Sequence, residues 1–533
     1  MTAALFAGCG SEEDTSGPAQ ETGDRQGAEN QGDTEGQEDT DGTEGTEGED
    51  SQAEDEEVAE IRVALMSFSP TEMDVQQRVQ DAINEKLEEM INVRVELVWS
   101  TADYGQQLPM MLQAGEDLDL VMFTPIPSAG FSSLMSQGQL MDITDYIEKY
   151  GPDIKAVLGE EGLAATSREG RIYGVGGNMC HYGGEGIAMR KDVLEDIDMV
   201  EKFENMTTWT ELEEILTAAV AAGHGGVINS DAEGSCITPQ PFMNGSDKLE
   251  EAYWVDVVGD GNQQVYVDPA DDKVKCFFMN EDYKASLIRA GEWYDKGLIY
   301  KDAATAEDYA ATQLKNQVGS CLINAQEFGW EGTLTSSVQA EVMMKFTGAF
   351  SKTATTSYTK FGYGVPVTSK EPEAAIKFLN LMYSQNEIHD TLAWGVEGID
   401  WVKNEDGTAG YPNGGDSSEY HKADFLFGDI LTVTPWADSG AGVREEQASL
   451  NAEVEFSKYI GFAIDNTNVV NQVTACQNVM NEFKPMLSSG VYGADGTEAK
   501  YEEFMTALEA AGINEILEEY QSQLDAWLAS NQS

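Results

Sequence analysis

The cysteines and histidines of this 533-residue chain form none of the spacings that commonly carry catalysis or hold a metal ion. Five of the six cysteines show no CxxC spacing: Cys180, Cys236, Cys276, Cys321 and Cys476. The four histidines, at positions 181, 224, 389 and 421, form no HExxH or other zinc pattern. The chain also lacks GxxxxGK[ST], GxSxG and GxGxxG motifs, and the glycine-rich run 174–177 is interpreted as a turn. We therefore predict neither a catalytic constellation nor a metal site, and no cofactor.

Five thiols cannot all pair with one another, and a disulfide framework is unusual in a chain of this length. Buried free thiols are the favoured interpretation. A Cys236–Cys276 disulfide within one lobe stays open as the alternative.

The sixth cysteine, Cys9, ends the segment Leu5-Phe6-Ala7-Gly8-Cys9. This segment resembles the lipobox of bacterial lipoproteins, whose cysteine is diacylated and becomes the first residue. Phe6 stands where that motif usually has leucine. Only eight residues precede Cys9 and none is basic, whereas a signal peptide needs a basic start and ~7–15 apolar residues. Residues 1–9 are therefore interpreted as the end of a truncated lipoprotein signal, and Cys9 as a lipid anchor.

Residues 10–57 contain no leucine, isoleucine, valine, methionine or aromatic side chain, and they are rich in aspartate and glutamate. Such a segment buries nothing against its ordering entropy and its charges repel each other, which predicts a disordered acidic tether. The whole chain holds 96 acidic and 31 basic side chains, a formal net charge of −65. This excess of acids argues against binding to nucleic acid or to anionic lipid through a basic patch.

From residue 58 onward, strand and helix patterns alternate. Residues 61–65 alternate apolar and polar, Ser69-Pro70-Thr71-Glu72 predicts a helix start, and an apolar stripe follows over 75–90. Strands are expected over 93–99 and 118–123, with a helix over 104–114 between them. Alternation of this kind predicts a parallel, helix-flanked sheet whose ligand loops follow the strands.

Further helices are expected in the second half of the chain. Thr208 to Glu211 forms a second capping box, helices are predicted over 284–296 and from Pro372, and residues 498–529 are mostly helical with a break at Gly512.

The order of these elements resembles the extracellular solute-binding proteins of ABC importers, in particular the family-one group that binds sugars. The phrases that carry this resemblance are Arg171–Val175, Met189–Leu194 and Thr208–Leu212, although Met189 and Arg190 replace a Tyr-Asn pair of the family. The second half is similar to the aldouronate-transport-like branch, whose C-terminal domain is uncharacterised. Its phrases here are Trp293–Asp302, Gly395–Gly398, Ile460–Asp465 and the stretch that begins with Ala511-Gly512-Ile513.

The resemblance implies a two-lobed α/β flytrap fold with helix-flanked sheets and a helical C-terminal segment. By analogy, the chain crosses between the lobes near 174–178, 320–328 and 358–364. The first lobe would then hold residues 58–175 plus 325–360. The second would hold 178–322 plus 362–533.

A sugar-binding cleft needs flat aromatic platforms together with fixed carboxylates and amides that pair with hydroxyl groups. Loops after strands and residues near the inferred crossings are the places where such side chains are expected. The candidate ligand-binding residues are Phe68, Thr124, His181, Tyr182, Phe242, Glu327, Phe328, Trp394, Glu397 and Trp401. Each aromatic taken alone has an ordinary core position as the alternative, and the two glutamates have solvated or helix-capping roles. Trp293 and Trp527 are assigned to the core because they lie on helical stripes.

The family implies a monomeric, non-enzymatic, lipid-anchored receptor on the extracytoplasmic face of a Gram-positive cell membrane. It would capture a solute, an oligosaccharide by expectation, and deliver it to integral-membrane ABC permease subunits. A receptor for a peptide or other non-sugar solute stays open. A secreted glycan-active enzyme is the third alternative, because glycosidases need just two carboxylates, but no such pair stands out in the sequence.

Overall fold

The computed structural model describes residues 57–531 except for 102, 229–241, 244, 252, 259–264, 307, 309, 348–351 and 416. The described residues belong to one compact unit, Glu57–Ser533. Cys9 and residues 10–56 of the expected tether lie outside the described residues. Among the described helices, none is long and apolar enough to cross a bilayer.

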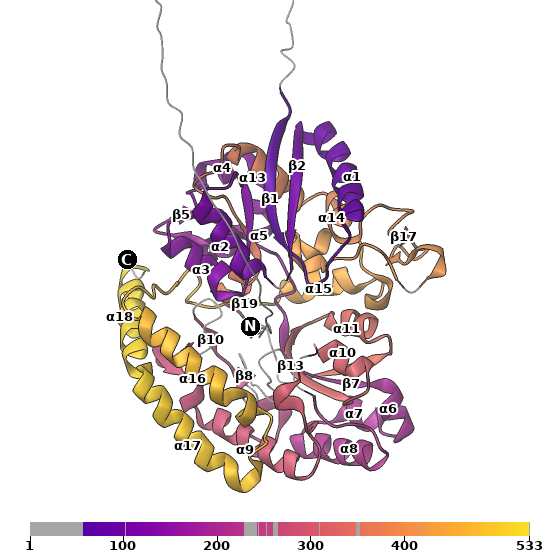
Figure 1. The fold of residues 1–533 in the computed structure, drawn as a ribbon, viewed down its shortest axis with the longest axis vertical. Helices are drawn as coiled ribbons and strands as arrows, with labels where there is room; N and C mark the ends of the chain where they lie inside the picture. The colour runs from indigo at the N-terminus through magenta and orange to yellow at the C-terminus, as the bar shows by residue number, and fades with distance from the viewer. Residues whose placement is uncertain are drawn as a thin grey trace, which may run out of the picture. The chain divides into compact units, whose positions relative to one another are not determined.

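A five-stranded sheet organises the first lobe (Figure 1), in the order β2-β1-β3-β16-β6. β1 pairs in parallel with both β2 and β3, and β16 is antiparallel to β3 and β6. The strands are β1 Ala59–Met66, β2 Val93–Ser100, β3 Leu120–Phe123, β6 Val175–Gly176 and β16 Gly362–Gly364. Both Val63 and its neighbour Ala64 are buried, because helices cover both faces of the sheet. The predicted parallel, helix-flanked arrangement is confirmed for β2-β1-β3, whereas the antiparallel β16 makes the whole sheet mixed.

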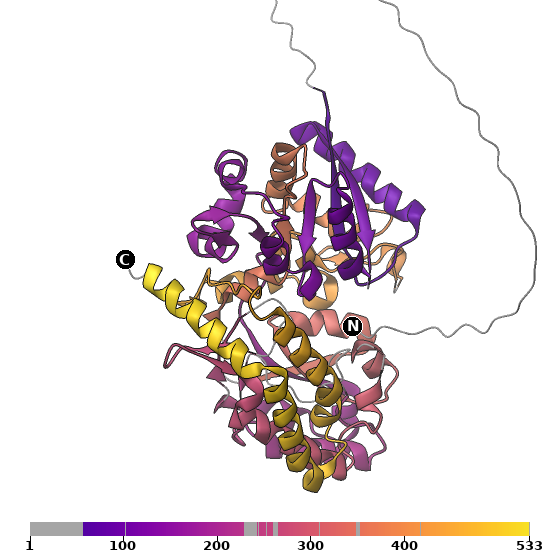
Figure 2. The ribbon, with the colours of Figure 1, turned by 60° about the vertical axis from the view of Figure 1, so that its left-hand side comes forward.

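The α-helices packed around this sheet (Figure 2) include α1 Met73–Ile91, α2 Tyr104–Ala114, α3 Phe131–Ser136, α4 Thr144–Tyr150, α5 Pro152–Ala165, α13 Pro372–Leu381 and α14 Asn386–Trp394. The expected stripe of α1 packs inward through Val75, Val79, Ile83 and Leu87.

The predicted helix start at Ser69 is wrong, because α1 begins at Met73 and has no side-chain cap. The residues before it are tied elsewhere. The Lys422 ammonium group donates hydrogen bonds to the Ser69 carbonyl and to the Thr71 hydroxyl, which holds this segment as a loop.

A smaller antiparallel sheet, in the order β13-β7-β14, organises the second lobe. Its strands are β7 Gly183–Arg190, β13 Cys321–Glu327 and β14 Val342–Thr347. The surrounding helices are α6 Lys191–Asp196, α7 Val200–Asn205, α8 Trp209–Ala221, α9 Glu281–Asp295, α10 Ala310–Lys315 and α11 Trp330–Val338. The capping box that begins α8 is confirmed: the Glu211 amide donates to the Thr208 hydroxyl, and the Thr208 amide donates to the Glu211 carboxylate.

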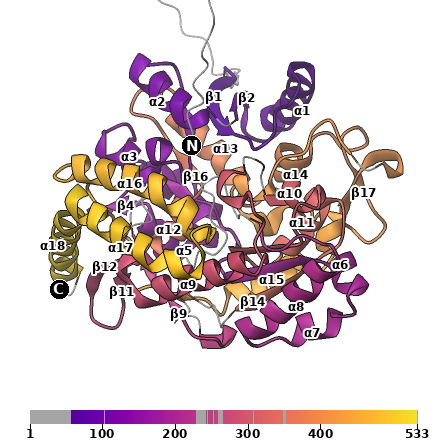
Figure 3. The same cartoon turned by 60° about the horizontal axis from the view of Figure 1, so that its bottom comes forward.

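Three long helices end the chain and pack beside α9 and a small sheet (Figure 3). They are α16 Val470–Ser488, α17 Gly493–Ala511 and α18 Ile513–Asn531, and the sheet consists of β10 Asp256–Val257, β11 Val265–Asp268 and β12 Lys273–Cys276. Their shared core runs from Val265 through Leu287 to Leu524. The predicted break at Gly512 is confirmed, since this residue ends α17 with φ 99°.

Short strands and one-turn helices connect these bodies. The strands are β4 Ser167–Arg168, β5 Arg171–Ile172, β8 Phe242–Met243, β9 Tyr253–Trp254, β15 Lys352–Thr353, β17 Val402–Lys403, β18 Ala409–Gly410 and β19 Glu455–Phe456. The remaining helices include α12 Thr355–Thr359, η6 Asp424–Leu426, η7 Ile430–Thr432, η8 Ala437–Ser439 and α15 Val443–Asn451.

Strand pairing corrects the expected lobe boundaries in two places. Residues 325–360 were expected in the first lobe, but β14 pairs with β7 of the second lobe. Residues from 362 onward were expected in the second lobe, but β16 pairs with β3 and β6, and the core of the first lobe continues to Trp436. The expected crossing at 320–328 is strand β13 of the second lobe. The described residues pass between the two sheets over 177–182 and 352–361, and again after 436.

The described cysteines at 180, 276, 321 and 476 are buried thiols that form no disulfide, as the favoured interpretation predicted. Cys236 lies outside the described residues, so its pairing with Cys276 stays untested. Trp293 and Trp527 pack in the core as expected.

Candidate functional site

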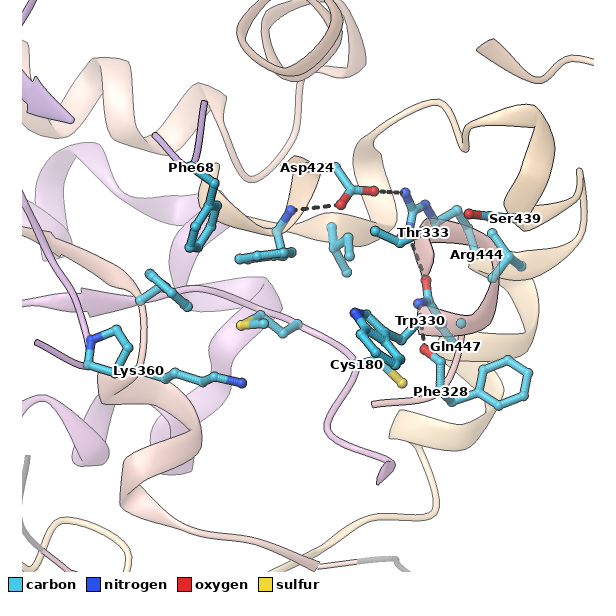
Figure 4. Close-up of a pocket in the computed structure, with 17 residues that line it drawn as sticks. Phe68, Cys180, Phe328, Trp330, Thr333, Lys360, Asp424, Ser439, Arg444 and Gln447 are labelled. Atoms are coloured by element: carbon cyan, nitrogen blue, oxygen red, sulfur yellow. Dashed lines mark hydrogen bonds and ion pairs between the residues drawn. The ribbon is translucent and has the colours of Figure 1, made fainter. Parts of the chain in front are cut away.

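A cavity of about 260 Å³ lies where the first lobe, the second lobe and the segment after Trp436 meet (Figure 4). Its lining is predominantly apolar and aromatic. The aromatic members are Phe68, Phe328, Trp330, Phe361 and Phe425, and the polar members are Thr333, Lys360, Asp424, Ser439, Arg444 and Gln447. This mixture of flat rings and a few polar groups is typical of a small-molecule site.

Three phenylalanines form the wall contributed by the first lobe. The ring centroids of Phe68 and Phe425 are 6.0 Å apart, those of Phe68 and Phe361 are 6.3 Å apart, and those of Phe361 and Phe425 are 5.5 Å apart. Phe68 follows β1, in the position where a parallel sheet places its ligand loops. Its side chain is 53% exposed although it belongs to an aromatic cluster, so this ring is available to a ligand.

Phe328 and Trp330 form the wall contributed by the second lobe, at the junction of β13 and α11. Gly329 between them adopts φ 92°, a left-handed conformation that favours glycine. This turn carries the chain from the strand into the helix, and both neighbouring residues line the cavity, although the Phe328 ring extends away from Trp330 (Figure 4). Figure 4 places Phe68 and Phe328 at opposite ends of the cavity.

The polar end of the cavity is built around Arg444 of α15. Its guanidinium group forms an ion pair with Asp424 and donates a 2.9 Å hydrogen bond to the Gln447 side-chain oxygen. The Gln447 amide in turn donates to the Phe328 carbonyl at 3.1 Å. Since the charges of Arg444 and Asp424 neutralise each other, this end offers fixed dipoles and not a net charge.

The loop that carries Phe68 is held from behind by Lys422. This lysine is 3% exposed, and its ammonium group donates to the Ser67 hydroxyl at 2.9 Å, the Ser69 carbonyl at 3.1 Å and the Thr71 hydroxyl at 2.7 Å. It also lies 5.0 Å from the centroid of the Trp99 ring. Burial lowers the pKa of Lys422 to about 8. The buried Lys422 side chain thus fixes the loop that carries the exposed Phe68 ring.

Two of the predicted ligand-binding residues, Phe68 and Phe328, line this cavity. Thr124 is completely buried, and its hydroxyl accepts the Ile126 amide at 3.3 Å. The lining residue at this strand end is its neighbour Pro125. Thr124 therefore shapes the loop and does not face the cavity.

His181 and Tyr182 lie in the first crossing segment and are not part of the cavity wall. The His181 ring packs against Tyr358 of the second crossing, with 4.5 Å between the ring centroids. The Tyr182 carbonyl accepts the Phe328 amide at 2.9 Å. His181 thus links the two crossing segments, and Tyr182 links the first crossing to the end of β13. Proximity to a crossing was therefore a misleading signal for both.

Trp394 and Trp401 are buried in the first-lobe core, contrary to their expected role as platforms. The indole N–H of Trp394 donates to the Thr434 carbonyl at 2.9 Å, and that of Trp401 donates to the Gly395 carbonyl at 3.2 Å. Trp401 and the exposed Glu397 border a different hollow, of about 510 Å³, beside α1 and α14. The segment Gly395–Gly398 follows α14 and is not part of the cavity lining.

Two predicted residues cannot be placed. Phe242 belongs to β8 and Glu327 ends β13, but their side chains lie outside the described residues. Their roles stay predictions.

Sequence reasoning missed Phe361, Phe425, Trp330, Arg444 and Gln447. Phe361 lies within the expected crossing at 358–364 and Trp330 lies two residues after Phe328, so a search of these neighbourhoods finds them. No local pattern distinguishes Phe425, Arg444 or Gln447, because tertiary packing brings η6 and α15 to the cavity. Among the described residues, no group of three or more His, Cys, Asp or Glu side chains could hold a metal ion.

A family model for the bacterial extracellular solute-binding protein matches residues 69–386, more than half of the chain. The chain belongs to this family. A second model, for a domain of unknown function (DUF3502), matches residues 458–529. This match covers the three C-terminal helices.

Similar proteins agree with this assignment. A carbohydrate ABC transporter substrate-binding protein from Streptococcus pneumoniae is 23% identical over 463 residues, which cover 84% of this chain and 87% of that protein. The crystal structure of the N-glycan transport solute-binding protein NgtS from the same species has a TM-score of 0.73 at 19% identity, covering 89% of this chain and 100% of the other. The ABC-transporter substrate-binding protein FusA of S. pneumoniae, solved in complex with kestose, has a TM-score of 0.60 at 16% identity, covering 88% of this chain and 100% of the other. At these identities the structural likeness concerns the fold.

Proposed function

We propose that this protein captures a carbohydrate in the cavity between its lobes and delivers it to an ABC permease. The observation that carries the proposal is the presence of aromatic residues on opposite sides of one cavity: Phe68 with its two partner phenylalanines on one side, and Trp330 with Phe328 on the other. Aromatic faces stack on the apolar faces of sugar rings, and the dipoles around Arg444 are suited to hydroxyl groups. The named relatives support the same ligand class, since NgtS has been solved with Man1GlcNAc and FusA with kestose.

The described lining residues of this cavity favour ligand binding without catalysis. Asp424 is the carboxylate among its described lining residues, and it is ion-paired with Arg444. A glycosidase of the usual kind needs two carboxyl groups on either side of the bond to be cleaved. We therefore expect no release of reducing sugar from oligosaccharides that bind.

Calorimetric titration tests the proposal. The panel comprises mannose- and N-acetylglucosamine-containing glycans, fructans, and xylo- and gluco-oligosaccharides, with peptides and amino acids as the non-sugar arm. Saturable binding of one sugar class, weakened by Phe68→Ala and unchanged by Met110→Ala on the exposed face of α2, is the expected outcome. Binding confined to the peptide arm would replace the carbohydrate by a different solute in the same fold.

The same proposal includes a lipid anchor at Cys9 on the extracytoplasmic side of the membrane and a monomeric protein. Its support is the lipobox-like segment and the family's extracellular role. Mass spectrometry of the membrane-associated native protein is expected to identify a diacylated Cys9 at the mature N-terminus. An unmodified Cys9, or processing at another residue, would contradict the anchor and leave solute capture unaffected.

A further inference from the structure

Helix α15 lies between the two lobes and carries three polar side chains on one face. Arg444, Gln447 and Asn451 are spaced by three and four residues, which aligns them along the same side of a helix. We call these three residues the α15 ladder. Each of them contacts a different part of the molecule.

The first member of the ladder binds the first lobe. Arg444 pairs with Asp424 of η6, and its Nε donates to the Val433 carbonyl at 3.4 Å. The side chains of Arg444 and Asp424 are only 11% and 19% exposed. Water therefore screens this ion pair less than it would screen one on the surface.

The other two members bind the second lobe and the first crossing. Gln447 is 3% exposed and donates to the Phe328 carbonyl at 3.1 Å. Asn451 accepts the His181 amide at 2.7 Å and donates to the Met179 carbonyl at 2.9 Å. One helix face thus binds both walls of the cavity and the chain that joins them.

Two glycines allow the second lobe to approach this segment closely. A Cβ atom on Gly329 would come within 2.8 Å of the Gln447 side-chain nitrogen. A Cβ atom on Gly332 of α11 would lie 2.6 Å from the Cα of Ser439 and 2.7 Å from the Asp438 carbonyl oxygen. All of these separations are shorter than real Cβ contacts. At Gly332 the atoms met belong to the backbone, so a larger residue there must push α11 away from η8, whereas at Gly329 the Gln447 side chain must move.

We infer that the α15 ladder positions the two aromatic walls relative to each other, with Gln447 as the residue that couples them. Gln447 accepts from Arg444, which is fixed on the first lobe, and donates to Phe328 on the second. Loss of either bond leaves a buried polar group without its partner, which favours a changed lobe spacing. The width of the cavity is therefore set by this helix before any ligand binds.

Two substitutions at Gln447 separate its two bonds. Gln447→Glu keeps the acceptor for Arg444 but removes the donor to the Phe328 carbonyl, while Gln447→Leu removes both. Gly332→Ala tests the same lobe spacing without changing Gln447, because the added Cβ atom would push α11 away from η8. Gly442→Ala is the matched control, because this residue precedes α15 with φ −93° and a Cβ atom there meets nothing within 4 Å.

Electron–electron distance measurements on the ligand-free full chain provide the test. Spin labels at Glu85→Cys of α1 and Thr217→Cys of α8, both exposed, report the lobe spacing in a background carrying Cys9→Ser and Cys236→Ser. We expect the parent and Gly442→Ala to share one distance distribution. Gln447→Glu, Gln447→Leu and Gly332→Ala should each shift or broaden it.

A parent-like distribution in folded Gln447→Glu and Gln447→Leu would overturn the inference. Thermal melts identify the folded variants, and Gly332→Ala decides the matter if both Gln447 variants fail to fold. No ligand is needed, so failure here leaves the proposed solute capture standing. Absence of a carbohydrate ligand would likewise leave this inference standing.

Discussion

At the level of single residues, Phe68 and Trp394 differ in what surrounds them. Phe68 is 53% exposed beside two other rings, whereas Trp394 is 3% exposed and packs against Trp436 with 5.0 Å between the ring centroids. A ring of the first kind is available to a ligand, and a ring of the second kind stabilises the fold. Residue type alone does not distinguish these two roles.

Alanine substitutions separate the two roles experimentally. Phe68→Ala is expected to weaken binding of the captured sugar by ~1–3 kcal/mol, ~5–150-fold in Kd, with little change in the free energy of unfolding. Trp394→Ala is expected to lower the free energy of unfolding by ~3–5 kcal/mol, because it leaves a cavity in the core. Titration calorimetry and urea denaturation measure the two quantities. Equal loss of stability in both variants would contradict the assignment of Phe68 to the site.

His421 provides a pH-dependent prediction at the same scale. It packs between Trp394 and Trp436, its Nδ1 has no hydrogen-bond partner among the described residues, and burial lowers its pKa to about 4. Between the unfolded value of 6.5 and about 4, the unfolded chain binds more protons than the folded one, so acid destabilises the fold. His421→Phe removes this contribution.

The measurement is the free energy of unfolding of the parent and of His421→Phe from pH 7 to pH 4. We expect the difference to be constant above pH 6.5 and to grow in favour of the variant as the pH falls, by at most ~1.4 kcal/mol per pH unit. His389, whose pKa burial also lowers to about 4, is common to both proteins and cancels. Parallel curves would show that His421 is not buried in its neutral form.

At the level of elements, the loop between β1 and α1 depends on a residue more than 350 positions away in the chain. A helix start was expected at Ser69, but the Lys422 ammonium group donates hydrogen bonds to three oxygens of residues 67–71 and holds them as a loop. The exposed aromatic ring is therefore supported by a buried cation. Because the loop is already held in place, the Phe68 ring loses less conformational entropy when a ligand binds.

Lys422→Met tests this role of Lys422. The variant removes the ammonium donor that three oxygens of residues 67–71 share and is expected to lose ~1–3 kcal/mol of stability. It should also show faster amide exchange over residues 67–71 and weaker ligand binding. The control is Lys370→Met, which removes an exposed ion pair with Asp117 and is expected to change stability by at most ~1 kcal/mol. Unchanged exchange in the β1–α1 loop of Lys422→Met would exclude the supporting role.

At the level of the whole molecule, the cavity lies between two bodies with separate cores that are joined by three chain segments. A ligand held by both walls gains most when the lobes close around it and exclude water. Small-angle scattering at saturating ligand is expected to give a smaller radius of gyration than the ligand-free protein. An unchanged radius at proven saturation would indicate a site that is already closed.

Much of the local structure was predictable because it depends on neighbouring residues. Three local patterns each predicted the element in which they lie. They are the alternation over 61–65 in β1, the apolar stripe from Val75 to Leu87 in α1, and the capping box at Thr208 that begins α8. The lobe boundaries were not predictable in this way. β16 inserts as an antiparallel strand between β3 and β6, and nothing within Gly362–Gly364 specifies that long-range pairing.

The sequence by itself therefore determined the family, the helix-flanked sheet and the helical end of the chain. It also determined one lining residue on each side of the cavity, Phe68 and Phe328. Only the tertiary structure decided which other rings face the cavity. It buried Trp394 and Trp401, and it brought Phe425, Arg444 and Gln447 to the cavity that Phe68 also lines, although they lie more than 350 residues from Phe68 in the chain. The physical reason is that hydrophobic periodicity encodes the burial of a helix or strand face, whereas a cavity forms where several loops converge. Convergence depends on packing between elements, which no local pattern records.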